Sequence, residues 1–263
     1  MRQVSYIFLI IFIFAGMIKV CNAQEIIILS TFEFPPEHSK ELPHHGIVSH
    51  IIELAFAKED IKVKWQYYPI TRAFMMAKSG RVDGTASYGY SKEREDGMYI
   101  SDSIITSTTY FYHLKTTKFH WEDINDLAGL TVGITNNFNY GDDFNKALKD
   151  KIFTGDNSNQ DALNFNKLLA ARIDIFPMTS GIAEYLLMTR FPKGTLEKIT
   201  YNKKPVKEYD SFIYFPQTLT NSLFILERFN QGLKKLKSSG QYQQILSNSS
   251  KGHYAISTVD NKE

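Results

Sequence analysis

The chain has 263 residues, of which 43% are hydrophobic, and a formal net charge of +2 at pH 7. A charge this close to balance gives no reason to expect nucleic acid or an anionic membrane surface as a partner. A chain of this length buries enough apolar surface to fold without disulfides, and its single cysteine permits none within the chain.

The N-terminal residues 1–23 have the pattern of a secretory signal peptide. Arg2 precedes an apolar run from Tyr6 to Ile18, and Cys21 and Ala23 supply the small residues that a signal peptidase reads. We predict cleavage after Ala23 and a periplasmic location. The run is shorter than the ~20 apolar residues of a membrane-spanning helix, although Lys19 leaves an uncleaved anchor as the alternative.

Short apolar runs then alternate with amphipathic helical patterns, which is typical of parallel sheets flanked by helices. In the first part of the chain we expect strands over residues 25–30 and 62–67 and helices over 46–58 and 69–79. Further on, we expect helices over 121–129, 142–149, 160–170, 181–188, 220–238 and 240–246, and strands over 130–134, 151–153, 173–176 and 209–215. A polar, frayed tail should begin at Ser247.

Two stretches of the chain repeat each other. Residues 79–84 (SGRVDG) and 170–175 (AARIDI) both place a small residue, Arg, a β-branched residue and Asp between a helical pattern and an apolar one. This repetition predicts two similar α/β lobes with a cleft between them, and such clefts favour small-molecule sites. The boundaries we predict are 24–112 and 212–250 for lobe 1, 113–211 for lobe 2 and 251–263 for the tail, with a hinge near 110–114 and 211–215.

Several motifs of this sequence, taken in their order, resemble one known family. They are FPP (34–36), SGRVD (79–83), SKER (91–94), ISD (100–102), DLAGLTVG (126–133), ARID (171–174) and LKKLKSSGQYQQI (233–245). The chain resembles the extracytoplasmic solute-binding proteins of family 3, the polar amino-acid type, which serve ABC importers. Residues 138–141 and 172–177 look like a divergent branch of that family.

The resemblance implies an α/β, bilobal periplasmic-binding-protein fold of type II. In this fold two mostly parallel sheets, flanked by helices, are joined by a two-strand hinge. The resemblance also implies a monomer that binds a small carboxylate-bearing solute without a cofactor and delivers it to an ABC permease in the inner membrane.

The resemblance assigns Arg94, which closes the SKER turn, to the solute carboxylate, because a planar guanidinium forms a bidentate pair with such a group. Ser87 and Tyr88 precede it on a loop that hydrogen-bonds the same carboxylate in the family. The alternatives are a surface arginine in the charge run 92–96 and an ordinary turn.

Lobe 2 should face the solute through the loop 135–141, where Asn137 and Phe138 precede a helix whose N-terminal N–H groups favour anions. Asn137 serves equally well as a helix N-cap. Thr179 stands near the position where members that bind α-amino acids often carry Asp for the ammonium group. An ammonium on the solute is therefore in doubt, whereas a carboxylate is not.

The remaining candidates are aromatic or basic. Phe34 and Tyr68 would stack against a planar or apolar ligand body, with core packing as the alternative. Arg72 lies one turn into a helix that starts beside the expected cleft, where it would contact an anion or lie on the helix surface.

No catalytic motif is present, so we expect no enzymatic activity and no catalytic residue. The alternative is a dehydratase of cyclic acids on the same fold, with Glu33 and Glu37 as candidates for its general acid. Another alternative is a ligand-sensing domain that acts on a separate membrane kinase. Four histidines, His38, His44, His45 and His50, lack regular ligand spacing, so we expect no metal site.

Overall fold

The computed structural model describes residues 24–136 and 138–255. The predicted signal peptide, Asn137 and the end of the predicted tail lie outside these residues. Within the described part of the chain, no helix has the length and apolar character needed to cross a membrane.

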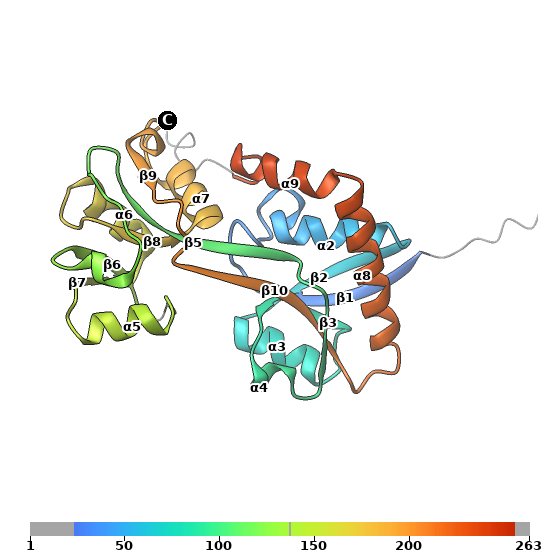
Figure 1. Cartoon of the computed structure of the whole chain (residues 1–263). Coiled ribbons are helices and arrows are strands. Elements are labelled where there is room, and N and C mark those ends of the chain that lie inside the picture. Colours follow the sequence, from blue (N-terminus) through green and yellow to red (C-terminus); the bar gives the residue numbers. More distant parts are fainter. Residues whose placement is uncertain (1–23, 137, 256–263) are drawn as a thin grey trace, which may run out of the picture.

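The chain forms two lobes joined by two long strands, which Figure 1 shows passing from one lobe to the other. These strands are β5 (Ile105–Leu114) and β10 (Lys207–Pro216). Lobe 1 lies on the right in Figure 1 and lobe 2 on the left.

Lobe 1 is built around a parallel arrangement in which β1 pairs with β2 on one side and β3 on the other. Its elements are β1 (Glu25–Thr31), η1 (Pro43–His45), α2 (Ile47–Ala57), β2 (Ile61–Tyr67), α3 (Ile70–Lys78), β3 (Gly84–Gly89), α4 (Lys92–Glu95), β4 (Met98–Ile100), α8 (Ser222–Ser238) and α9 (Gln241–Ser250). Helix α2 packs on α8 through Phe56 and Phe229, whose rings lie 5.1 Å apart and are buried. Two segments far apart in sequence thus share one core.

Lobe 2 contains a smaller parallel pair, β6 with β7, and a strand, β8, that pairs with β5. Its elements are η2 (Ile124–Leu127), β6 (Thr131–Thr135), α5 (Asp142–Lys149), β7 (Thr154–Ser158), α6 (Asp161–Leu169), β8 (Phe176–Thr179), α7 (Ser180–Arg190), η3 (Leu196–Lys198) and β9 (Ile199–Tyr201). Phe165, Phe176 and Ile173 lie in its core.

The repeated Asp of the sequence makes the same pair of hydrogen bonds in each lobe. The Asp83 carboxylate accepts a hydrogen bond from the backbone N–H of Ile28 at 2.7 Å, and its own N–H donates to the Ile28 carbonyl. Asp174 makes the same two bonds to Thr131, with the carboxylate contact again at 2.7 Å. Each Asp therefore fixes a helix-to-strand turn to the first strand of its lobe, which explains the repeated residues.

The sheet differs in detail from the two separate, mostly parallel sheets that we expected. Strands β2, β1, β3, β10, β5 and β8 follow one another in a continuous, mixed sheet of eight strands, with β4 and β9 at its sides, and only β6 and β7 form a second sheet. The reason is the length of β5 and β10, which have ten residues each and take part in both lobes.

The crossing also lies elsewhere than predicted, because β5 and β10 pair over Ile105–Thr109 and Lys207–Ser211. The stretches that we chose, 110–114 and 211–215, are the apolar halves of these strands. They pair inside the lobes, the first with β8 and β9 and the second with β3 and β4. The crossing residues are more polar: Thr106 and Ser103 both donate to the Asp210 carboxylate.

Two predicted strands of lobe 2 are displaced towards the C-terminus. Strand β7 begins at Thr154 rather than at 151, and β8 begins at Phe176 rather than at 173. Lys151 and Ala171, at the ends of the preceding helices, have φ of 59° and 51°, so a turn separates helix from strand. Phe153 and Ile173 are buried in these turns, which explains why their apolar character suggested strands.

The C-terminal segment is ordered further than we expected. Helix α9 continues to Ser250, and the Tyr254 side chain is only 4% exposed within the lobe 1 core. The Tyr254 hydroxyl lies 2.6 Å from the His50 imidazole Nδ1. One aromatic residue thus anchors a polar segment that the sequence predicted to fray.

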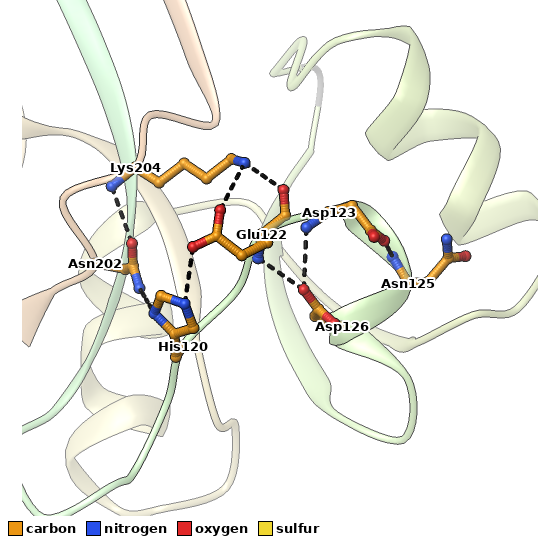
Figure 2. Close-up of polar contacts among 7 residues, drawn as sticks. All are labelled: His120, Glu122, Asp123, Asn125, Asp126, Asn202 and Lys204. Carbon is orange, nitrogen blue, oxygen red and sulfur yellow. Dashed lines mark hydrogen bonds and ion pairs between the residues drawn. The ribbon is translucent and has the colours of Figure 1, made fainter.

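A polar network near the start of lobe 2 ties that lobe to the segment before β10 (Figure 2). Lys204 donates to both the backbone carbonyl and the carboxylate of Glu122, and its ammonium lies over the Trp121 ring. Asp126 accepts the N–H groups of Glu122 and Asp123, which lowers the pKa of its carboxyl. The network fixes where the chain enters and leaves lobe 2.

Candidate functional site: a cavity beside the crossing strands

A cavity of about 690 Å³ lies where lobe 1 meets the crossing strand β10, and we call it the first cavity. Five of the nine residues predicted for the site line it: Phe34, Tyr68, Ser87, Tyr88 and Arg94. The sequence analysis did not assign Lys40, Tyr67, Tyr209 or Ser211 to the site, although they line it too. Tyr209 and Ser211 carried no local signal, because only the pairing of β10 with β3 and β5 brings them to this place.

Arg94 is held at this cavity by a short capped helix. The Ser91 hydroxyl accepts the Arg94 backbone N–H at the N-terminus of α4. The guanidinium donates to the Gly89 carbonyl at 2.9 Å, and its Cζ lies 5.6 Å from the centre of the Tyr88 ring. Among the described residues, no carboxylate forms an ion pair with it, so the guanidinium retains the capacity to bind an anion.

Tyr88 provides a rigid surface beneath the guanidinium. Its hydroxyl donates to the Ile70 carbonyl at 2.6 Å, and burial raises the pKa of this phenol to about 12. Phe32 and Phe74 pack on its ring, each with its centroid 5.3 Å away. Tyr88 therefore combines a structural role with a place in the cavity lining.

Ser87 has two features that are typical of a functional position. Its φ is +67°, a left-handed backbone that residues other than glycine rarely adopt, and the opposite strand β10 has a register shift between Phe212 and Ile213. Its buried hydroxyl has no hydrogen-bond partner, and the same holds for the Ser211 hydroxyl. Both residues line the first cavity, so a rotation of these side chains would offer two unpaired hydroxyls to a guest.

Aromatic side chains form another part of the lining. Phe34 packs beside Phe32, with ring centroids 6.0 Å apart, and the Tyr68 hydroxyl donates to the Gln66 side chain. Arg72 does not line the cavity: it is exposed, and its guanidinium lies 5.3 Å from the centre of the Tyr68 ring. Arg72 therefore packs on a residue of the cavity lining from the helix surface and does not reach the cavity itself.

Glu37 and Glu33 both line the first cavity but lie in different environments. Glu33 is exposed and accepts the Lys40 backbone N–H at 3.2 Å. Glu37 is 9% exposed, and burial raises the pKa of its carboxyl to about 7. The Glu37 backbone is fixed, because its carbonyl accepts the N–H of Val48 in the first turn of α2.

A second cavity, of about 390 Å³, begins on the other side of Glu37, which lines both. Thr179 lines this second cavity and not the first, and its hydroxyl lies 3.3 Å from that of Thr109. The Tyr209 phenol interacts with residues of both cavities, Glu37 and Thr179. Burial and the Glu37 carboxylate raise the pKa of its phenol, whereas hydrogen bonds with Thr179 and Ser107 lower it.

The other predicted residues of lobe 2 lie apart from the first cavity. Phe138 packs on Tyr140, with ring centroids 4.9 Å apart, against the core beneath α5. Asn137 lies outside the described residues. In this arrangement of the lobes, lobe 1 and β10 provide the whole lining of the first cavity.

The four histidines have different contacts, and only His44 and His50 pack on each other. His38 is buried with its Nδ1 2.7 Å from the Ser49 hydroxyl, His44 stacks on His50 at 3.9 Å, and His45 lies 3.1 Å from Glu53. Among residues 24–136 and 138–255, no group of three or more His, Cys, Asp or Glu is arranged to hold a metal ion.

Solved structures with the same fold cover most of the chain. Substrate-binding domain 2 of Lactococcus lactis GlnP, in an open conformation, has 19% sequence identity and a TM-score of 0.70, over 86% of this chain and 96% of that one. The L-cystine solute receptor of Neisseria gonorrhoeae, unliganded and open, has 15% identity and a TM-score of 0.70, over 89% and 96%. The GluR0 ligand-binding core from Nostoc punctiforme, in complex with L-glutamate, has 18% identity and a TM-score of 0.58, over 84% and 98%.

These likenesses confirm the expected α/β class and its type II periplasmic-binding-protein architecture. In sequence, no curated protein matches the chain. A family model for bacterial extracellular solute-binding proteins, family 3, matches residues 27–249. Because this match covers most of the chain, the protein belongs to the bacterial extracellular solute-binding proteins of family 3.

Proposed function

We propose that this protein is the periplasmic substrate-binding protein of an ABC importer and that it captures a small carboxylate-bearing solute between its lobes. The observation that carries the proposal is Arg94, whose guanidinium lines the first cavity without a carboxylate partner among the described residues. A guanidinium in this setting binds a carboxylate through two parallel hydrogen bonds. The unpaired hydroxyls of Ser87 and Ser211 add donors beside it.

Closure of the lobes would complete the site. In the present arrangement, lobe 1 and β10 line the first cavity, and Thr179 of lobe 2 lines the neighbouring one. Rotation about the crossing segments of β5 and β10 would bring the start of α7 over the solute. Two of the similar solved structures are described as open forms, which supports this interpretation.

The proposed partner is a membrane permease, to which the loaded protein delivers its solute as a monomer. We propose no enzymatic turnover and no cofactor. The alternatives are a cyclic-acid dehydratase, which requires product formation, and a sensing domain, which requires a kinase partner.

A thermal-shift screen tests the function. The protein is unfolded and refolded to remove carried-over solute, and then screened against the L-amino acids, their deaminated and 2-hydroxy analogues, and small dicarboxylates. We expect at least one carboxylate to raise the melting temperature, because binding to the native state stabilises it. If no carboxylate raises it, the proposal is wrong. Analysis of the incubated ligand for product distinguishes a receptor from a dehydratase.

A further inference from the structure

We propose that Glu37 binds the positively charged amino group of the solute, so that this protein takes amino acids although Thr179 offers no carboxylate for that group. The inference rests on the proposed function and narrows its solute class from carboxylates in general to those that carry an ammonium group. It assigns the recognition of the ammonium to lobe 1, on the same side of the cleft as Arg94.

The first argument is that Glu37 is buried without a partner. No hydrogen bond or ion pair from any described residue reaches its carboxylate, although the residue is only 9% exposed. Glu59, another buried carboxylate, has two ion-pair partners: Arg228 and Lys235 lie 3.3 and 2.7 Å from its oxygens. The Glu37 oxygens are not among the fully enclosed side-chain atoms that lack a partner, so the carboxylate remains accessible from the cavities that it lines. An unpaired carboxylate with little exposure that still faces a cavity points to a group supplied from outside.

The second argument is that Glu37 is held in place. The carbonyl oxygens of Pro36 and Glu37 accept the N–H groups of Ile47 and Val48, at 3.0 and 3.1 Å, in the first turn of α2. Because these bonds tie the segment to an eleven-residue helix, the carboxylate is presented from a rigid support.

The third argument is the charge arrangement of the first cavity. Arg94 and Glu37 both line it, and neither has a partner of opposite charge among the described residues. An α-amino acid carries a carboxylate and an ammonium on one carbon, so a guest that spans the cavity from Arg94 to Glu37 would neutralise both groups. The cavity, at about 690 Å³, has ample volume for such a guest.

Other carboxylates fit this role less well. Glu33 lines the same cavity but is exposed and already accepts the Lys40 backbone N–H. Glu184 lines the second cavity and not the first, so it does not share a cavity with Arg94. Among the carboxylates that the structure describes, Glu37 lines both cavities, and it shares the second cavity with Thr179, near which the family resemblance led us to look for an Asp.

The charged and titratable groups around Glu37 do not set its protonation. Across the first cavity lie Glu33, Lys40, Arg94 and Tyr209, besides the tyrosines of the lining, and across the second lie Glu184 and Tyr242. The neighbouring His38 is buried, which lowers the pKa of its imidazole to about 3, so it carries no charge near neutral pH. Burial alone raises the pKa of Glu37 to about 7. An ammonium would therefore displace a proton from a fraction of the molecules at neutral pH.

The test compares three proteins and matched ligands. Wild type, E37Q and E41Q are titrated by calorimetry with the best-binding L-amino acid of the screen, with its deaminated acid and with its 2-hydroxy acid. E37Q is expected to bind the amino acid at least tenfold more weakly and to bind the deaminated acid within twofold of wild type. E41Q, which removes an exposed carboxylate outside both cavities, is expected to preserve the wild-type preference.

A pH series on wild type gives a reading that does not depend on the folding of a variant. Between pH 5.5 and 7.5 the amino acid keeps its ammonium, and its affinity is expected to rise about 20-fold as Glu37 loses its proton, whereas the affinity of the deaminated acid stays level. If only amine-free acids bind, or if E37Q retains the preference for the ammonium, the inference is overturned while the proposed function stands. If no carboxylate binds to wild type, the proposed function itself is wrong.

Discussion

The guanidinium of Arg94 lies over the ring of Tyr88, with Cζ 5.6 Å from the ring centre, while one of its nitrogens donates to the Gly89 carbonyl at 2.9 Å. Three neighbouring residues of the chain thus cooperate: Gly89 and Tyr88 orient a cation, and the N-cap Ser91 fixes the backbone from which it extends. The remaining N–H groups of the guanidinium are available to a ligand.

Arg94→Ala is expected to weaken solute binding at least tenfold, because the carboxylate of the bound solute would lose its charge-assisted hydrogen bonds to the guanidinium. The melting temperature of the unliganded protein should change little, since Arg94 makes no ion pair among the described residues. Calorimetric titration and a thermal melt measure the two effects. Arg72→Ala is the matched control: this exposed arginine stacks on Tyr68 outside the cavity, and its loss should change affinity less than threefold.

Ser87→Ala is expected to weaken binding without lowering the stability of the unliganded protein. The Ser87 hydroxyl is buried without a partner, so its removal should leave the free energy of unfolding unchanged or slightly higher in the absence of solute. Affinity for the solute should fall about two- to tenfold, the effect of one lost hydrogen bond of roughly 1 kcal/mol. Urea unfolding and titration measure these quantities. A variant that loses stability but keeps full affinity would show that the hydroxyl serves the fold.

Gly46→Ala is expected to disturb both the fold and the site. A Cβ at Gly46 would lie 2.5 Å from the Glu37 carbonyl oxygen, and φ there is +96°. The substitution should therefore lower the free energy of unfolding by more than the about 1–2 kcal/mol of left-handed strain alone, and should weaken solute binding by displacing Glu37. Gly129 has φ +79° and open space around the Cβ, so Gly129→Ala should lower the free energy of unfolding by the backbone strain alone and leave the affinity for solute unchanged. Equal effects of the two substitutions in urea unfolding and titration would contradict this reasoning.

Tyr254→Ala is expected to destabilise lobe 1 by about 3 kcal/mol, because it empties a buried aromatic position. His50 would also lose the hydroxyl that lies 2.6 Å from its Nδ1. Tyr254→Phe removes the hydrogen bond alone and should cost about 1 kcal/mol. The measurement is urea unfolding of the three proteins, and a Tyr254→Ala variant as stable as wild type would restore the view of this segment as a frayed tail.

The stability of the unliganded protein should depend on pH through Glu37. Burial raises the pKa of this carboxyl from 4.5 in the unfolded chain to about 7, so its contribution to stability is fully present below pH 4.5 and is lost as pH rises through 7. E37Q cannot titrate. Relative to wild type, its free energy of unfolding should therefore increase from pH 4.5 to 8, by a shift on the order of 3 kcal/mol.

His38 and His50 act in the other direction, because burial lowers the pKa of His38 to about 3, and burial together with His44 lowers that of His50 to about 4. Their contributions are present above pH 6.5 and are lost as pH falls through those values. Both proteins share this loss, so the difference between E37Q and wild type isolates Glu37. Urea unfolding at several pH values measures it, and a constant difference would mean that Glu37 does not titrate in this range.

The sequence by itself determined the local elements and their order. Hydrophobic periodicity located β1, β2, α2, α3, α5, α6 and α8 to within about two residues, since period and capping depend on neighbouring residues alone. The repeated Arg-x-Asp sequence indicated two lobes, although the bonds that Asp83 and Asp174 make to Ile28 and Thr131, 55 and 43 residues earlier, are visible only in the structure. The resemblance of the SKER and neighbouring motifs to a known family pointed to Ser87, Tyr88 and Arg94, and these three residues line one cavity.

The tertiary structure alone decided which side chains lose contact with water. Glu37 resembles any glutamate in a polar loop, and it becomes a buried, unpaired carboxylate only when α2, β10 and the segment after β1 meet around it. Ser211 and Tyr209 reach the cavity through the pairing of β10 with strands more than one hundred residues earlier in the chain. Burial is a property of segments brought together from distant parts of the sequence, so no local pattern encodes it.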